Sequence, residues 1–111
     1  MDPTCRVALA AYLHDLGKLT ERANVHDKTS EAWKAHLTLY AKFNQQGGYH
    51  SHQHAAATGL ALDLIERFLP PVLHGDVSPF LSRDTAGDPT DSFVNAAARH
   101  HVPETMLQWC I

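Results

Sequence analysis

The chain has 111 residues, a net charge of -3 with its histidines neutral, nine histidines and two cysteines. This length suits a single domain with one hydrophobic core, and a hydrophobic fraction of 44% is typical of a globular chain and excludes a disordered one. The negative charge excludes a domain that clamps nucleic acid by bulk electrostatics, and no apolar run approaches the roughly 18 residues that a membrane span requires.

The two cysteines, Cys5 and Cys110, lie near opposite ends of the chain and form no Cys-x-x-Cys pair. Two cysteines are too few for a disulfide framework, so we expect reduced thiols in a cytoplasmic protein. The opening residues begin acidic and carry charge inside their apolar stretch, so we expect no secretory signal peptide.

Helical patterns begin at the first residues. One helix is predicted over residues 3–22, because Asp2 can cap it, Pro3 suits its first turn and residues 7–13 are apolar all round. Such an apolar surface indicates a central, buried helix. Residues 23–29 form a polar connection.

Two further helices follow in the pattern. One is predicted over residues 30–43, with aromatic side chains on one face at helical spacing, and a segment rich in glutamine and glycine ends it. The other is predicted from residue 51 or 53 to residue 69, where Pro70 and Pro71 stop it.

The last part of the chain contains a loop pattern and two more helices. Residues 70–88 are rich in proline, glycine, aspartate and serine, and we expect a mobile loop there. A fourth helix is predicted from residue 88 or 91 to residue 101, and Pro103 opens a fifth whose pattern is cut off at Ile111. The cut-off indicates a domain excised from a longer chain. No segment predicts a strand, so residues 1–111 are expected to form one all-α domain of about five helices.

A histidine and an aspartate, His14 and Asp15, occur together near the end of the first predicted helix. Their neighbours are apolar, so both side chains are predicted to point inward, where an isolated carboxylate needs a counter-charge or a metal. Gly17 allows another backbone or a substrate to approach closely, and Lys18 lies one turn after His14, where it could touch a phosphate. The alternative is a helix end with an ordinary hydrogen-bonded histidine.

Three more histidines alternate along the chain at the start of the third predicted helix. His54 lies on the inner face of that helix and is a candidate metal ligand. His50 is one turn earlier on the same side and is a reserve ligand, whereas His52 is predicted to point to solvent. The alternative is a polar helix N-terminus with no metal.

A histidine pair, His100 and His101, closes the fourth predicted helix after three alanines. Both residues start from the inward side of the helix, and two adjacent imidazoles without a metal repel each other when protonated. We interpret them as metal ligands, and the alternative is a frayed helix end. His36 is a further reserve ligand, and His26 and His74 are predicted to be structural or surface residues.

Together these residues resemble the signature of the HD phosphohydrolase superfamily, whose members are all-helical domains that hold one or two divalent metals. The residues that carry the resemblance are His14, Asp15, His54, His100 and His101.

Three stretches narrow this resemblance and cover nearly the whole chain. Residues 11–23 (AYLHDLGKLTERA), residues 54–58 (HAAAT) and residues 97–108 (AARHHVPETMLQ) are similar to motifs of the HD nuclease domain in the large subunit of type III CRISPR-Cas effector complexes. That subunit has its HD pair close to the N-terminus, as this chain does. The family's later aspartate ligand has no counterpart before Ile111, so the resemblance leaves the metal site incomplete.

The resemblance implies a metal-dependent nuclease that hydrolyses phosphodiester bonds of single-stranded DNA in antiviral defence. Its partners would be the other subunits and the guide RNA of the effector complex. It implies that His14 and Asp15 bind metal, with Asp15 bridging two ions if two are present. The second site would be supplied by His54, His100 and His101. Imidazole-rich ligation favours Mn, Ni, Co, Fe or Zn over Mg.

Other charged residues are predicted to act on the nucleic acid. Lys18 is a candidate to neutralise charge that develops on the phosphate, and Arg22 or Arg99 is a candidate to steer the strand. Two alternatives stay open. One is another HD phosphohydrolase, a nucleotidase or a cyclic-dinucleotide phosphodiesterase, although no Gly-Tyr-Pro follows the histidine pair. The other is a non-catalytic HD scaffold with an incomplete metal site.

Overall fold

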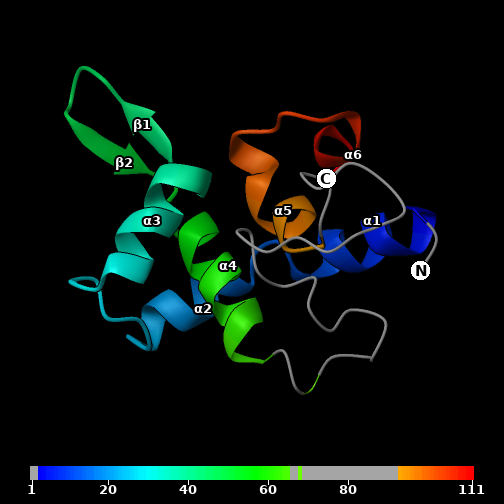
Figure 1. The fold of residues 1–111 in the computed structure, drawn as a ribbon, viewed down its shortest axis with the longest axis horizontal. Helices are drawn as coiled ribbons and strands as arrows, with labels where there is room; N and C mark the ends of the chain where they lie inside the picture. Colours follow the sequence, from blue (N-terminus) through cyan, green and yellow to red (C-terminus); the bar gives the residue numbers. More distant parts are fainter. Residues whose placement is uncertain (1–2, 66–67, 69–92) are drawn as a thin grey trace.

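The computed structural model describes residues 3–65, 68 and 93–111 (Figure 1). These residues are mostly helical, with one small two-stranded sheet, which confirms the predicted all-α class. The predicted Asp2 cap, the predicted loop at 70–88 and the predicted start of the fourth helix lie outside the described residues. None of the helices in the described ranges has the length and apolar character that crossing a membrane requires.

The prediction of one continuous helix over residues 3–22 is wrong. The chain instead forms α1 (Pro3–Leu13) and α2 (Leu16–Arg22), which are separated by a turn at His14 and Asp15. The two helices have different partners, because α1 packs on α5 whereas α2 packs on α4. Nor is α1 buried all round, since the Tyr12 side chain is 85% exposed. The break therefore places His14 and Asp15 in the turn between two helices that pack on different partners.

The helix α3 (Glu31–Tyr40) begins where Ser30 accepts a hydrogen bond from the Trp33 N–H. It ends earlier than predicted because the next residues form a hairpin of β1 (Lys42–Asn44) and β2 (Tyr49–Ser51). The strands are antiparallel, with Phe43 opposite His50. Three-residue strands are too short to show an alternating pattern, so the expectation that no strand forms is wrong. In Figure 1 the hairpin extends from α3 away from α1 and α5.

The core is formed mainly by α4 (His54–Leu64) and α5 (Phe93–Ala98). Each contains three consecutive alanines that are completely buried, residues 55–57 in α4 and 96–98 in α5. Because alanine is small, the helix backbones can pack closely. The helix α4 ends at Leu64 rather than residue 69.

The chain continues from α5 into a short 3-10 turn, η4 (Arg99–His101), and then into α6 (Met106–Trp109). Thr105 caps α6 in a reciprocal capping box with Gln108, so this helix begins after the predicted Pro103. The turn at η4 leaves the two adjacent histidines at the end of a fully buried helix, next to the start of α4.

Candidate metal centre

A glycine and a threonine bring α2 and α4 into contact. The Gly17 N–H donates a 2.9 Å hydrogen bond to Thr58 Oγ1, and Thr58 Oγ1 lies 3.0 Å from the carbonyl oxygens of both His14 and His54. A Cβ atom at Gly17 would lie only 1.9 Å from the His54 carbonyl oxygen. Glycine is therefore required here, as predicted from its lack of a side chain, and the close approach places Asp15 beside the first residue of α4.

The Asp15 carboxylate is the common neighbour of the site. Its Oδ1 lies 3.5 Å from His54 Nε2 and 3.8 Å from His100 Nε2. Its Oδ2 lies 3.4 Å from His14 Nε2 and 3.2 Å from Lys18 Nζ. Asp15 therefore joins side chains from the α1–α2 corner, α4 and η4, which are far apart in the sequence.

The imidazole rings extend this cluster past Asp15. His101 Nε2 lies 3.2 Å from His54 Nε2, and the rings of His100 and His101 are 4.1 Å apart at their centroids. The His14 ring meets the His100 ring edge-on at 4.9 Å. The His52 ring stacks on His101 with a centroid distance of 3.9 Å and an angle of 16° between planes.

Potential ligand atoms gather in two groups of three residues, and within each group they lie within 4.8 Å of one another. The first group combines a carboxylate with two imidazoles, and the second is made of imidazoles alone. The groups are His14, Asp15 and His100, and His52, His54 and His101.

Hydrogen bonds to the backbone orient two of the rings. His14 Nδ1 donates to the Ala11 carbonyl oxygen, and His100 Nδ1 donates to the Ala97 carbonyl oxygen at 3.2 Å. Each bond leaves Nε2 with a free lone pair that faces Asp15, which is the arrangement that metal-binding histidines adopt. His100 Nε2 is buried and has no hydrogen-bond partner among the described residues. A divalent ion would satisfy this atom, so the donor set fits a metal.

Burial lowers the pKa of three histidines of the cluster, and neighbouring side chains lower the pKa of its aspartate. Burial lowers the pKa of His54, and burial together with neighbouring histidines lowers the pKa of His100 and of His101 to about 4. Burial alone would raise the pKa of Asp15, but the hydrogen bond from Lys18 and the charge of His14 outweigh it, so that this pKa is lowered. Neutral imidazole and ionised carboxylate are the states that bind metals.

All five residues predicted as metal ligands meet in this cluster. Sequence reasoning missed a sixth, His52, which is exposed as predicted but turns back onto His101. The alternation of His50, His52 and His54 was the signal that could have identified it, but the orientation of the His52 ring depends on the hairpin. These six residues are His14, Asp15, His52, His54, His100 and His101.

The other histidines lie elsewhere. His36 is buried, with Nδ1 2.8 Å from the Ala32 carbonyl oxygen, and His50 Nδ1 lies 3.2 Å from the Ala41 carbonyl oxygen. Neither reserve ligand belongs to a metal-binding group among the described residues. His26 stacks on Trp33, which agrees with a structural role, and His74 lies outside the described residues.

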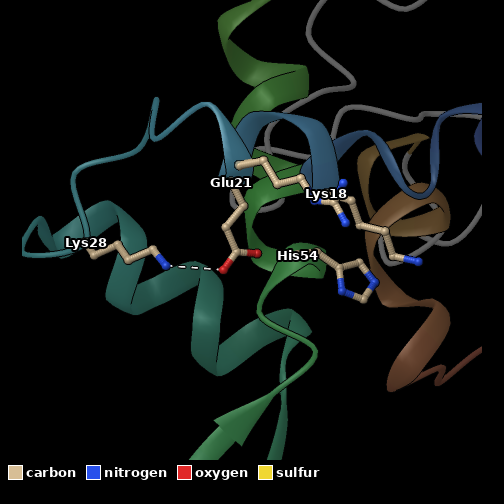
Figure 2. A pocket seen from close by; sticks show the side chains of 5 residues that line it. Lys18, Glu21, Lys28 and His54 are labelled. Atoms are coloured by element: carbon tan, nitrogen blue, oxygen red, sulfur yellow. Dashed lines mark hydrogen bonds and ion pairs between the residues drawn. The ribbon is translucent and has the colours of Figure 1, made fainter.

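A basic pocket of about 500 Å³ adjoins the cluster at His54. Lys28 Nζ lies 3.2 Å from Glu21 Oε1, and Figure 2 shows this pair at one side of the pocket. Lys18 and His54 lie on the side toward α5. Arg22 also lines the pocket. Three cations against one carboxylate leave this pocket positive although the chain is negative overall.

Two other features flank the centre. An apolar groove of about 360 Å³ is lined in part by Asp15, and its lining includes the exposed side chains of Tyr12 and Leu19. Arg99, a candidate strand-steering residue, instead pairs with Glu104 at 3.2 Å and lies over the Tyr40 ring. We therefore assign Arg99 a structural role.

The fold and this cluster define a mostly helical domain with His and Asp groups that could hold a metal. Comparison of the chain with protein-family models, with curated proteins and with solved structures found no match.

Proposed function

We propose that this domain is a metal-dependent phosphohydrolase of the HD type that cleaves phosphodiester bonds of single-stranded DNA. The observation that carries the proposal is the meeting of the Asp15 carboxylate with imidazoles from three separate parts of the chain. A cluster of imidazoles around a carboxylate suits divalent transition ions such as Mn, Ni, Co, Fe or Zn.

The metal would be held by the five predicted ligands, with Asp15 shared between two ions if two are bound. These ligands are His14, Asp15, His54, His100 and His101. A bound divalent ion supplies an activated water and stabilises the charge that develops on a phosphate. Lys18 holds the Asp15 carboxylate ionised and in place through its 3.2 Å contact. His14 and His100 present Nε2 toward that carboxylate because their Nδ1 atoms are engaged by backbone carbonyls.

The surfaces beside the cluster support a nucleic-acid substrate. The basic pocket with Lys18, Arg22 and Lys28 offers cations to a phosphate, and the apolar groove with exposed Tyr12 offers a face on which an unstacked base can lie. A stacked duplex presents no free base face, which favours a single strand. With a net charge of -3, affinity for DNA is expected to be low unless partners contribute.

We further propose a setting for this activity. The domain would act in the cytoplasm in CRISPR-Cas antiviral defence, within a type III effector complex whose other subunits and guide RNA position the DNA. The three motif-like stretches at residues 11–23, 54–58 and 97–108 support this assignment.

The test is hydrolysis of a labelled single-stranded DNA by the metal-free domain after addition of Mn²⁺ or Ni²⁺, compared with duplex DNA, mononucleotides and cyclic dinucleotides. Cleavage of single strands that His14→Ala and Asp15→Ala abolish supports the proposal. Metal binding with turnover of mononucleotides or cyclic dinucleotides alone would replace it with another HD phosphohydrolase. Metal binding by none of the ions would indicate a non-catalytic scaffold.

A further inference from the structure

The backbone of His52 is held in an uncommon conformation. Its φ angle is 55°, in the left-handed region that few residues other than glycine adopt, although histidine does so more often than most, and this costs on the order of 1 kcal/mol. His52 lies between the end of β2 and the first turn of α4, where its carbonyl oxygen accepts a hydrogen bond from the Ala55 N–H. Strain of this kind persists only when the surroundings impose it.

This conformation brings the His52 ring over the end of the cluster. The ring stacks on His101 at 3.9 Å and meets the His54 ring edge-on at 6.0 Å. One nitrogen from each of the three rings lies within 4.8 Å of the others. The hairpin that immediately precedes His52 was not predicted, so this contact between the three rings arises only in the folded chain.

The spacing of two of these nitrogens matches metal coordination. Two nitrogens bound to one tetrahedral Zn²⁺ at about 2.0–2.1 Å are about 3.3 Å apart, and His54 Nε2 and His101 Nε2 are 3.2 Å apart. Three protein ligands with a fourth position open to solvent is the usual arrangement of reactive zinc sites. The exposed position of His52 leaves such an opening.

We propose that His52, His54 and His101 form a three-imidazole metal site of their own, selective for Zn²⁺, Ni²⁺ or Co²⁺ over Mg²⁺. The neighbouring group differs because it includes the Asp15 carboxylate, an oxygen ligand that Mg²⁺ and Mn²⁺ accept. The inference rests on the metal centre of the proposed function but not on hydrolysis of DNA, and it gives His52 a role that the proposed function does not require.

The test measures zinc bound per chain after equilibrium dialysis of the metal-free protein against Zn²⁺ in excess Mg²⁺. His52→Asn removes the imidazole while asparagine tolerates the left-handed backbone. The matched control is His50→Asn, two residues earlier in the hairpin, whose ring contacts Phe43 and Ala41 and not the cluster. We expect wild type and His50→Asn to bind two zinc ions, and His52→Asn to lose one or to bind it at least tenfold more weakly.

Unchanged zinc stoichiometry and affinity in His52→Asn would overturn the inference. Thermal unfolding in EDTA separates a ligand from a packing residue, since the ligand role predicts that metal-free His52→Asn and His52→Gly unfold no earlier than wild type. A lowered midpoint in EDTA together with unchanged zinc binding would make His52 structural and also overturn it.

The DNA assay separates this inference from the proposed function. Loss of zinc in His52→Asn with no cleavage by wild type would uphold the site and overturn the nuclease. Cleavage by wild type together with unchanged zinc binding in His52→Asn would overturn the site and uphold the nuclease. Failure of wild type to bind zinc would overturn the inference, and failure to bind any of the divalent ions tested would overturn both.

Discussion

Asp15 Oδ1 lies 3.5 Å from His54 Nε2, although the two residues belong to different helices and to separate sequence motifs. This relationship depends on Gly17 and Thr58, which hold the two backbones in contact one turn away. It places Asp15, a member of one group of potential ligands, beside His54 of the other.

Asp15→Asn is expected to weaken metal binding strongly while leaving the fold intact. An amide replaces the charged oxygens with a neutral, poorer ligand, so the group of His14, Asp15 and His100 loses its carboxylate. We expect at least a tenfold rise in the dissociation constant for Mn²⁺, measured by calorimetry, and DNA cleavage at least a hundredfold slower. The control is Glu31→Gln, which neutralises an exposed carboxylate outside the cluster. Equal Mn²⁺ affinity in the two variants would remove Asp15 from the metal centre.

Gly17→Ala is expected to separate α2 from α4. The new methyl group would lie 1.9 Å from the His54 carbonyl oxygen and 2.4 Å from the Thr58 nitrogen, so the backbones must move. Overpacking of this kind costs about 1–3 kcal/mol or more of unfolding free energy. Chemical denaturation measures the loss, and Lys18→Ala, an exposed neighbour on the same helix, should cost under about 1 kcal/mol. A Gly17→Ala variant as stable as Lys18→Ala would contradict the close contact.

Tyr40→Phe is expected to destabilise the core. The buried Tyr40 hydroxyl donates a 2.7 Å hydrogen bond to Asn95 Oδ1 and links α3 to α5. Its loss should cost about 1–3 kcal/mol, seen as a lower denaturation midpoint. The matched control is Tyr49→Phe, whose hydroxyl is exposed and only weakly engaged by Asn44 at 3.4 Å. The control should be close to neutral, and similar losses in the two variants would argue against a specific buried bond.

The metal-free protein is expected to lose stability as the pH falls below about 6.5. Burial lowers the pKa of His36 in the folded state, and the pKa of His100 falls to about 4. The unfolded chain therefore takes up these protons first, so the stabilisation is complete above pH 6.5 and declines as the pH falls toward 4. Each group contributes at most about 1.4 kcal/mol per pH unit. Denaturation in EDTA at several pH values measures the slope, and His36→Gln should reduce it. A flat profile would contradict the burial of these rings.

Arg22→Ala is expected to weaken DNA binding without changing metal affinity. Arg22 lines the basic pocket beside His54 but belongs to neither ligand group. Removing one phosphate contact should lower the slope of log affinity against log salt by about 1. Lys34→Ala, an exposed cation of α3 outside the pocket, is the control and should leave this slope unchanged. A rise in the metal dissociation constant of Arg22→Ala would assign the pocket to the metal centre and not to the strand.

Local patterns predicted much of the fold and of the candidate site. The all-α class follows from helical periodicity, which depends on neighbours three and four residues away and can be read directly. The inward position of His54 follows from the same periodicity. His14 and Asp15 meet His54 as predicted, but they lie in the turn between α1 and α2 with side chains 33% and 42% exposed, so the prediction that both point inward is wrong. The requirement for glycine at residue 17 was also foreseeable, because only a missing Cβ permits such contact.

Other features could not be predicted because they depend on distant partners. Helical propensity continues through residues 14 and 15, but α1 and α2 pack on different helices, and the chain breaks between them. The hairpin strands are too short to leave a pattern. The turn of His52 onto His101 comes from its left-handed backbone beside that hairpin, and the modest preference of histidine for this region does not decide where its ring lies.

The sequence by itself determined that this chain is helical and which imidazoles and carboxylate are candidate ligands, because these properties arise from residue type and short-range spacing. Only the tertiary structure decided how the potential ligands divide. It joined His100 to His14 and Asp15, and it set His52 against His54 and His101. The physical reason is that a metal site depends on distances of a few ångströms between side chains, and the packing of α2 and α5 on α4 and the turn of the hairpin set those distances.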